Sequence, residues 1–160
     1  MKIDTLMAAA APGKVAEQAQ HYEQPGFDCV WSFEAMSDAF LPLAHAAAAT
    51  KKLEVGTNIA VAFARSPFSM AQIAWDMQRD SGGRFHLGLG TQVRAHNERR
   101  ISMPFDHLAA RVTDYIRCIS AHSEHYQHGT LADYYSPLSI FTVMKPFFKQ
   151  GLIASLQLPI

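Results

Sequence analysis

Short apolar segments alternate along the first two-thirds of the chain with longer segments whose apolar residues recur at helical spacing. Proline or glycine stands at many of the changes between the two kinds of segment. The short segments predict four strands, at residues 2–7, 27–32, 53–59 and 85–90. Because strands that alternate with helices in this way pair in parallel, the pattern predicts an α/β protein with four βα units.

The longer segments predict four helices. The first lies between Pro12 and Pro25, the second covers about 39–50, and the third begins at Ser66 and Pro67 and ends before the next glycines. The fourth has one strongly apolar face, formed by Leu108, Val112, Tyr115, Ile116 and Ile119. Beyond Gly129 the periodicity is lost.

The length of 160 residues fits one domain, so we expect a single domain over 1–160 with an irregular tail at 130–160. Both a doubly wound sheet and a (β/α) barrel begin with four such units. A complete barrel needs eight units and about 250 residues, so this chain would supply half of one.

Composition removes several classes of protein. Hydrophobic residues make up 49% and charged residues 18%, as in soluble globular proteins. Lys plus Arg total 14 and Asp plus Glu total 14, so we expect neither a nucleic acid nor a membrane as partner. The apolar run from Leu6 to Ala11 is too short for a membrane span. Two cysteines are too few for a disulfide framework, and we expect the cytoplasm.

The candidate chemistry lies where the strands end, because both architectures place their sites at the carboxyl ends of strands. Gly88-Leu89-Gly90 has the start of a dinucleotide fingerprint, but Val93 stands where the third glycine is needed. Glycines here either make a tight bend or let a planar ring lie against the backbone, and spacing alone favours the bend. The residues that follow the strands are Glu34, residues 57–60, Gly90, Thr91 and Gln92.

Several motifs together resemble the luciferase-like monooxygenase superfamily, and among its branches the F420-dependent oxidoreductases. The resemblance extends from about residue 2 to about residue 148. The motifs that carry it are Leu53 to Phe63, Arg65-Ser66-Pro67, Ala74-Trp75-Asp76, Ser81 to Gln92, His96 to Arg100, Met103-Pro104, and Thr142, Met144 and Pro146-Phe147-Phe148.

This resemblance implies an incomplete (β/α)8 TIM barrel of about four βα units with parallel strands. It implies an oxidoreductase that binds coenzyme F420 or FMN and exchanges a hydride between the cofactor and a small-molecule substrate. It also implies a non-proline cis peptide bond at Asn58-Ile59. The catalytic residues implied are Glu34 and His96, and the cofactor-binding residues are Asn58, Ile59, Ala60, Gly90, Thr91 and Gln92.

Each of these side chains also has a purely structural interpretation. Glu34 could cap the helix that follows it, and Asn58 could hold a turn through a bond from its side chain to the backbone. His96 could lie at the surface. Arg99 and Arg100 could bind phosphate, although neighbouring Glu98 favours a solvated, ion-paired segment.

A histidine cluster could instead form a metal site. Cys118, His122, His125 and His128 are spaced by four, three and three, so neighbours share a helix face and could ligate zinc. No carboxylates complete the set, and we expect no metal.

The chain departs from the family at its end, because it stops at Ile160, where the family's fifth strand would start. We therefore expect a truncated barrel that lacks the loops that commonly bind the cofactor's phosphate. The first and fourth strands would have open edges. The expected partner is a second copy of the chain or a complementary half-barrel; the alternative is a non-catalytic remnant that self-associates through these edges.

Overall fold

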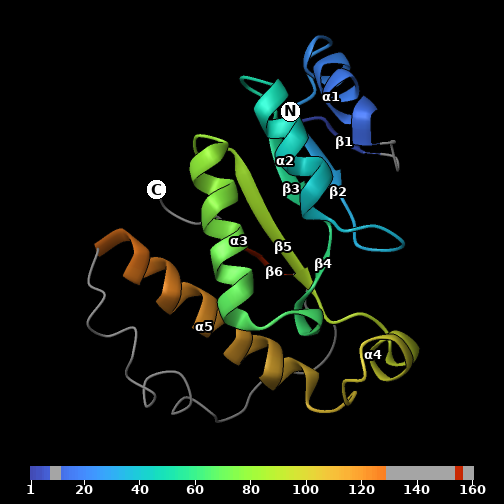
Figure 1. The fold of residues 1–160 in the computed structure, drawn as a ribbon, viewed down its shortest axis with the longest axis vertical. Coiled ribbons are helices and arrows are strands. Elements are labelled where there is room, and N and C mark those ends of the chain that lie inside the picture. Colours follow the sequence, from blue (N-terminus) through green and yellow to red (C-terminus); the bar gives the residue numbers. More distant parts are fainter. Residues whose placement is uncertain (8–11, 129–153, 157–160) are drawn as a thin grey trace. The chain divides into compact units, whose positions relative to one another are not determined.

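The computed structural model of the chain describes residues 1–7, 12–128 and 154–156 (Figure 1). These residues divide into two compact units. The first unit holds residues 1–60, 73–90 and 154–156, and the second holds residues 61–72 and 91–128. That the whole chain forms one domain stays a prediction.

A parallel sheet forms the centre of the first unit. Strands β1 (Asp4–Leu6), β2 (Cys29–Ser32), β3 (Glu54–Thr57) and β5 (Phe85–Gly90) lie side by side in that order, and each adjacent pair is parallel. The four strands predicted from the sequence and their parallel pairing are confirmed. The apolar runs identified them because strands covered by helices need apolar side chains.

Two further short strands join β5. Strand β4 (Ala60–Val61) lies next to β5 at the end of the strand order, and β6 (Ala154–Leu156) pairs antiparallel with residues 87–89 of β5. The fourth predicted strand is therefore paired along this stretch, and not open as expected, because a later part of the chain returns to it. The rest of the expected tail at 130–160 lies outside the described residues.

Helices cover one face of this sheet. Helix α1 (Val15–Glu23), which follows a 3-10 turn at Pro12–Lys14, packs against α2 (Phe40–Ala49), and α2 packs on β2 and β3. Most residues of β2, β3 and β5 are buried, whereas Trp31 of β2 and His86 of β5 are half-exposed, and their ring centres lie 5.9 Å apart. The buried side chains include Val30, Leu43, Val55, Phe85 and Leu87, each at most 1% exposed.

Cys29 belongs to this buried set. It is 2% exposed, and burial raises the pKa of its thiol to about 12. Cys118 is also a free thiol but is only half-buried. Cys29 is therefore protonated and out of reach of solvent in the folded sheet.

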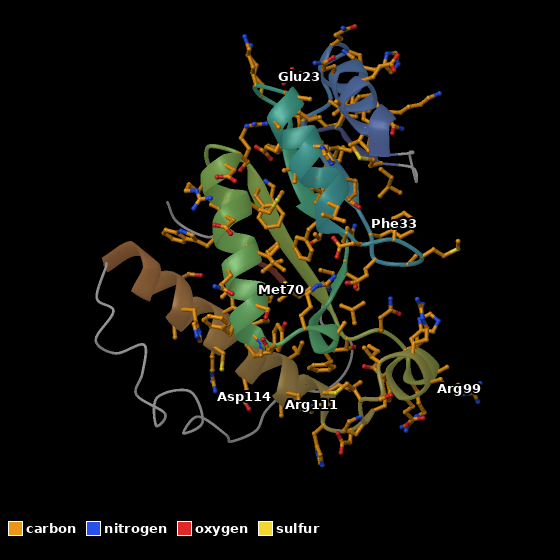
Figure 2. The ribbon with its side chains drawn as sticks, in the orientation of Figure 1. Glu23, Phe33, Met70, Arg99, Arg111 and Asp114 are labelled. Carbon is orange, nitrogen blue, oxygen red and sulfur yellow. The ribbon has the colours of Figure 1, made fainter. Side chains whose placement is uncertain are left out.

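The second unit is built around a long helix. Helix α5 (Leu108–His128) confirms the predicted amphipathic helix. Its Tyr115 hydroxyl donates to the carbonyl oxygen of Arg65 at 3.0 Å, and the Arg111 guanidinium lies 4.3 Å from the centre of the Phe63 ring (Figure 2). These contacts fix α5 to the 3-10 turn Ala62–Ala64 and to the residues that follow it.

Helix α3 (Pro67–Asp80) runs through both units and begins where the sequence predicts, with the Ser66 hydroxyl accepting from the backbone N–H of Ser69 at 3.1 Å. Helix α4 (Arg94–Arg100) is not among the helices predicted from the sequence. Its residues have no apolar stripe that could have predicted a helix. No helix in the described ranges is long and apolar enough to cross a membrane.

Candidate functional site

The carboxyl end of β3 is joined to β5 through a side chain. The regular pairing of the two strands ends at Gly56 and His86. Beyond it, the Thr57 hydroxyl donates to the carbonyl oxygen of Gly88 at 2.8 Å and accepts from the Gly88 N–H at 2.9 Å. A Cβ at Gly88 would overlap the carbonyl oxygen of Thr57, so only glycine allows this close approach.

The next two residues connect β3 to the end of β2. The backbone N–H of Asn58 donates to the carbonyl oxygen of Ser32 at 2.6 Å, and the N–H of Glu34 donates to the carbonyl oxygen of Ile59 at 3.0 Å. The peptide bond between Asn58 and Ile59 is cis, as the family resemblance implied. Glu34, which is half-buried, therefore has its backbone fixed against Ile59.

Gly90 lies against the side chain of Ile59. A Cβ at Gly90 would lie 2.9 Å from the Cγ1 and Cδ1 atoms of Ile59, and Ala60 beside it is fully buried. The first unit thus brings together five of the predicted site residues around the carboxyl ends of three adjacent strands: Glu34, Asn58, Ile59, Ala60 and Gly90.

The remaining predicted residues lie in the second unit. Gln92 has a positive φ of 61°, and its Oε1 atom lies 3.1 Å from Nδ1 of His96. The Thr91 hydroxyl donates to the carbonyl oxygen of Gln92 at 3.3 Å. Thr91, Gln92 and His96 therefore form one local cluster at the start of α4, and their roles stay predictions.

A charged cluster lies at the opposite, amino end of β3. Glu54 accepts from Lys2 Nζ through Oε1 at 2.9 Å, and its Oε2 atom lies 2.9 Å from Nε2 of His86. The hydrogen bond from Lys2, followed by that with His86, holds the pKa of the Glu54 carboxyl below its usual range. This cluster joins β3 and β5 to the residues before β1, at the end of β3 opposite to the predicted site residues, and we assign it no catalytic part.

The histidine cluster is described only in part. His122 Nδ1 lies 2.7 Å from the carbonyl oxygen of Cys118, and the His122 ring contacts that of Phe68. The side chains of His125 and His128 lie outside the described residues. Among the residues whose side chains are described, no group of three or more His, Cys, Asp or Glu could hold a metal ion.

Sequence reasoning missed two residues of the candidate site. Thr57 was identified only as one of the residues after the third strand, and its double bond to Gly88 depends on tertiary geometry. Asn97 lies in a run of polar residues, yet it is fully buried and bonds to the backbone of residues 91 and 93. No periodicity distinguishes it from its exposed neighbours.

Comparison with protein families and curated proteins identifies relatives. The family model for luciferase-like monooxygenases matches residues 2–141. An uncharacterized protein of Mycobacterium tuberculosis, Rv1360, is 44% identical over 135 residues, which cover 84% of this chain and 40% of the relative. A putative coenzyme F420-dependent oxidoreductase of the same species, Rv3520c, is 36% identical over 109 residues, covering 68% of this chain and 31% of the relative.

Solved structures share the fold. The coenzyme F420-dependent tetrahydromethanopterin reductase of Methanopyrus kandleri matches with a TM-score of 0.67 and 21% identity, over 77% of this chain and 40% of that chain. The oxygenating constituent of the 3,6-diketocamphane monooxygenase of Pseudomonas putida, in complex with FMN, matches with a TM-score of 0.63 and 15% identity, over 100% of this chain and 44% of that chain. These matches confirm the predicted fold class, part of a TIM barrel. The chain spans about 40% of the length of the first-matched curated relatives.

Proposed function

The chain belongs to the luciferase-like monooxygenase family, and from this membership we propose that it forms part of an oxidoreductase that uses F420 or FMN. The reaction would transfer a hydride between the cofactor and a small organic substrate. Two relatives of this chain support the cofactor class, since one is named as F420-dependent and one was solved with FMN.

The observation that carries the proposal is that Glu34 and Gly90 both contact Ile59. The Glu34 N–H donates to its carbonyl oxygen, and the backbone of Gly90 lies against its side chain with no Cβ between them. Glycine at position 90 lets the half-buried Ile59 side chain pack directly on the backbone of β5, and the apolar surface that Ile59 presents can support the face of a flat ring. The residues present therefore fit a ring cofactor at this edge of the sheet.

Glu34 is the residue of the first unit suited to proton transfer. Its backbone is fixed by the bond to Ile59, and its carboxyl group can hold or release a proton at an oxygen atom. The cofactor, when bound, supplies the hydride chemistry. By the family resemblance, Thr91 and Gln92 of the second unit would line the cofactor's edge, and His96 would take part in catalysis.

The proposal includes a partner. In TIM barrels the phosphate site is frequently formed by the loops after the seventh and eighth strands, and the relatives are more than twice as long as the matched region. We propose that a second copy or a complementary half-barrel supplies this part of the site. The chain alone would then bind the ring part of the cofactor with low affinity.

Size-exclusion chromatography with light scattering tests the proposal. The chain is mixed with FMN or with F420, and visible absorbance is recorded across the eluting peak. A species of twice the 17.7 kDa chain mass that carries the chromophore would support a site completed by two copies. A colourless dimer would favour the non-catalytic alternative. Adding a separately produced C-terminal half of a relative tests completion by a complementary half-barrel.

A further inference from the structure

Asn97 is a fully buried polar residue on α4 with no role in the site described so far. Its Nδ2 atom donates to the carbonyl oxygen of Thr91 at 2.6 Å and to that of Val93 at 3.2 Å. Its backbone N–H also donates to Val93, at 3.1 Å, and its carbonyl oxygen accepts from Met103 at 2.9 Å. One residue therefore fixes the loop on both sides of α4.

The Oδ1 atom of the Asn97 side chain indicates that Asn97 does more than stabilise the fold. Its Oδ1 atom is buried and has no hydrogen-bond partner among the described residues. A buried acceptor without a partner is unfavourable, and an apolar side chain of similar shape would avoid it. Such departures from good packing concentrate at functional sites. The orientation of the amide is also determined, because flipping it would point an oxygen at two carbonyls.

The two carbonyl groups held by Nδ2 belong to the residues before and after Gln92. Gln92 has a φ of 61°, a conformation that side-chain-bearing residues rarely adopt without support. Its Oε1 atom meets His96 Nδ1, one residue before Asn97 on the same helix. Holding Thr91 and Val93 thus fixes the backbone orientation of Gln92 and, with it, the direction of the Gln92 and His96 side chains.

We propose that Asn97 is a positioning residue that presents Thr91 and Gln92 to the cofactor through the two hydrogen bonds of its Nδ2 atom. This inference rests on the proposed function, in which Thr91 and Gln92 line the cofactor's edge. Asn97 itself touches neither cofactor nor substrate. Its effect is to hold the loop of residues 91–93 in one conformation before the cofactor binds.

Three variants separate positioning from folding. Asn97→Leu keeps the branched shape and removes both the donor and the unpaired acceptor. Asn97→Asp keeps the shape and replaces the donor by a group that donates only when protonated. Arg99→Ala is the matched control, since Arg99 lies on the same helix, is exposed and extends away from it (Figure 2). Thermal unfolding by circular dichroism establishes that each variant is folded at the temperature used.

The first measurement is hydrogen exchange of residues 91–97 in the cofactor-free chain. We expect Asn97→Leu to lose protection there by roughly tenfold, the effect of about one net hydrogen bond, with unchanged protection in β3 and β5. In Asn97→Asp the ratio of protection to that of the wild type should rise as the pH is lowered, because the protonated carboxyl again donates to Thr91. Arg99→Ala should match the wild type at every pH.

The second measurement is the dissociation constant for FMN and for F420, each titrated by fluorescence. We expect Asn97→Leu to raise it by roughly tenfold or more, and Asn97→Asp to approach the wild type at low pH. Wild-type protection of residues 91–97 in Asn97→Leu would overturn the inference, as would an Asn97→Asp variant that never recovers. If the wild type binds neither cofactor, alone or with the separately produced C-terminal half of a relative, the proposed function fails, and the exchange measurement alone decides whether Asn97 holds the loop.

Discussion

The hydroxyl group of Thr57 occupies the place of a backbone partner for Gly88. Its oxygen donates to the Gly88 carbonyl at 2.8 Å and accepts from the Gly88 N–H at 2.9 Å, beyond the last regular pair of β3 and β5. Thr57 and Gly88 are both buried, so water cannot replace either bond. The connection between the two strands at the candidate site therefore depends on one side chain.

Replacing Thr57 by Val keeps the shape and removes both bonds. We expect the free energy of unfolding to fall by about 2–4 kcal/mol, because a buried N–H and a buried carbonyl each lose their partner. Thr57→Ser keeps the hydroxyl and should lose only about 1 kcal/mol for the missing methyl group. Urea denaturation measures both. A loss in Thr57→Val that is no larger than the loss in Thr57→Ser would contradict the part assigned to the hydroxyl group.

Gly88→Ala should destabilise the sheet. The added Cβ would overlap the backbone carbonyl oxygen of Thr57, which cannot move without shifting β3. Overpacking of this kind costs about 1–3 kcal/mol, or more where backbone is involved. Gly13→Ala is the matched control, since no described atom beyond its two chain neighbours lies within 4 Å of a Cβ built there. The melting temperature should fall for Gly88→Ala and stay close to that of the wild type for Gly13→Ala.

Gly90→Ala should affect the cofactor more than the fold. Its added Cβ would meet the side chain of Ile59 at 2.9 Å, and a side chain can yield where a backbone cannot. We expect a smaller fall in melting temperature than for Gly88→Ala. The dissociation constant for FMN or F420 should rise roughly tenfold, because a displaced Ile59 side chain no longer supports the ring of the cofactor. An unchanged affinity would place the cofactor elsewhere.

Glu23 should give the first unit part of its resistance to acid. Its Oε1 atom accepts from three successive backbone N–H groups, those of Lys51, Lys52 and Leu53, at 2.8, 2.7 and 3.1 Å. These bonds, that from Lys52 first, lower the pKa of the carboxyl. Since the folded pKa is the lower one, the stabilisation is complete above the unfolded pKa and is lost as the pH falls through the folded value.

Glu23→Gln removes this charge and should lower the free energy of unfolding at neutral pH by about 1–2 kcal/mol. The difference from the wild type should shrink as the solution is acidified through the carboxylate range. Glu17→Gln, an exposed change on the same helix, should leave stability within about 0.5 kcal/mol. Denaturant titrations at a series of pH values measure all three proteins. A difference that is independent of pH would refute the role of the charge.

Arg84 should not be replaceable by lysine. Its guanidinium donates to the carbonyl oxygens of Ala47, Thr50, Leu53 and Ser81, at 2.6 to 3.3 Å, and so joins the end of α2 to the residue before β3 and to the turn after α3. A lysine has three donors on one atom and cannot span this set. We expect Arg84→Lys to lower the free energy of unfolding by about 1–3 kcal/mol.

The matched control for Arg84 is Arg79→Lys. Arg79 is exposed and forms ion pairs with Asp76 and Asp80, which lysine can also form. Its replacement should change stability by less than about 0.5 kcal/mol. A similar loss in both variants would mean that the carbonyl oxygens near Arg84 find other partners.

The sequence predicted the elements whose signal is local. The apolar runs at β2, β3 and β5 identified the sheet, and the spacing of Leu108 to Ile119 identified α5. Helix α4 was missed because its surface is polar all round, and β6 because a three-residue strand carries no periodicity. Both depend on contacts made after the chain has folded.

The candidate site could be predicted only in part. The positions of Glu34, Ile59 and Gly90 at the strand ends followed from the alternation of strands and helices, but the cis bond at Asn58-Ile59 came only from the family resemblance. The bonds of Thr57 and Asn97 to the backbone were not predictable, because polar residues of either type are common in loops. Tertiary geometry alone distinguishes them.

The burial of Cys29 makes its thiol a probe of how often the sheet opens. A maleimide reacts only with an accessible thiolate, and Cys29 is 2% exposed with a pKa of about 12, so it can react only when β2 separates from its neighbours. Cys118, half-buried on α5, would react in a separate, earlier phase. The rate of the slow labelling phase thus reports how often the strands beside Glu34 separate. A bound cofactor or partner that stabilises this sheet would lower that rate, and no label has to be placed on the site itself.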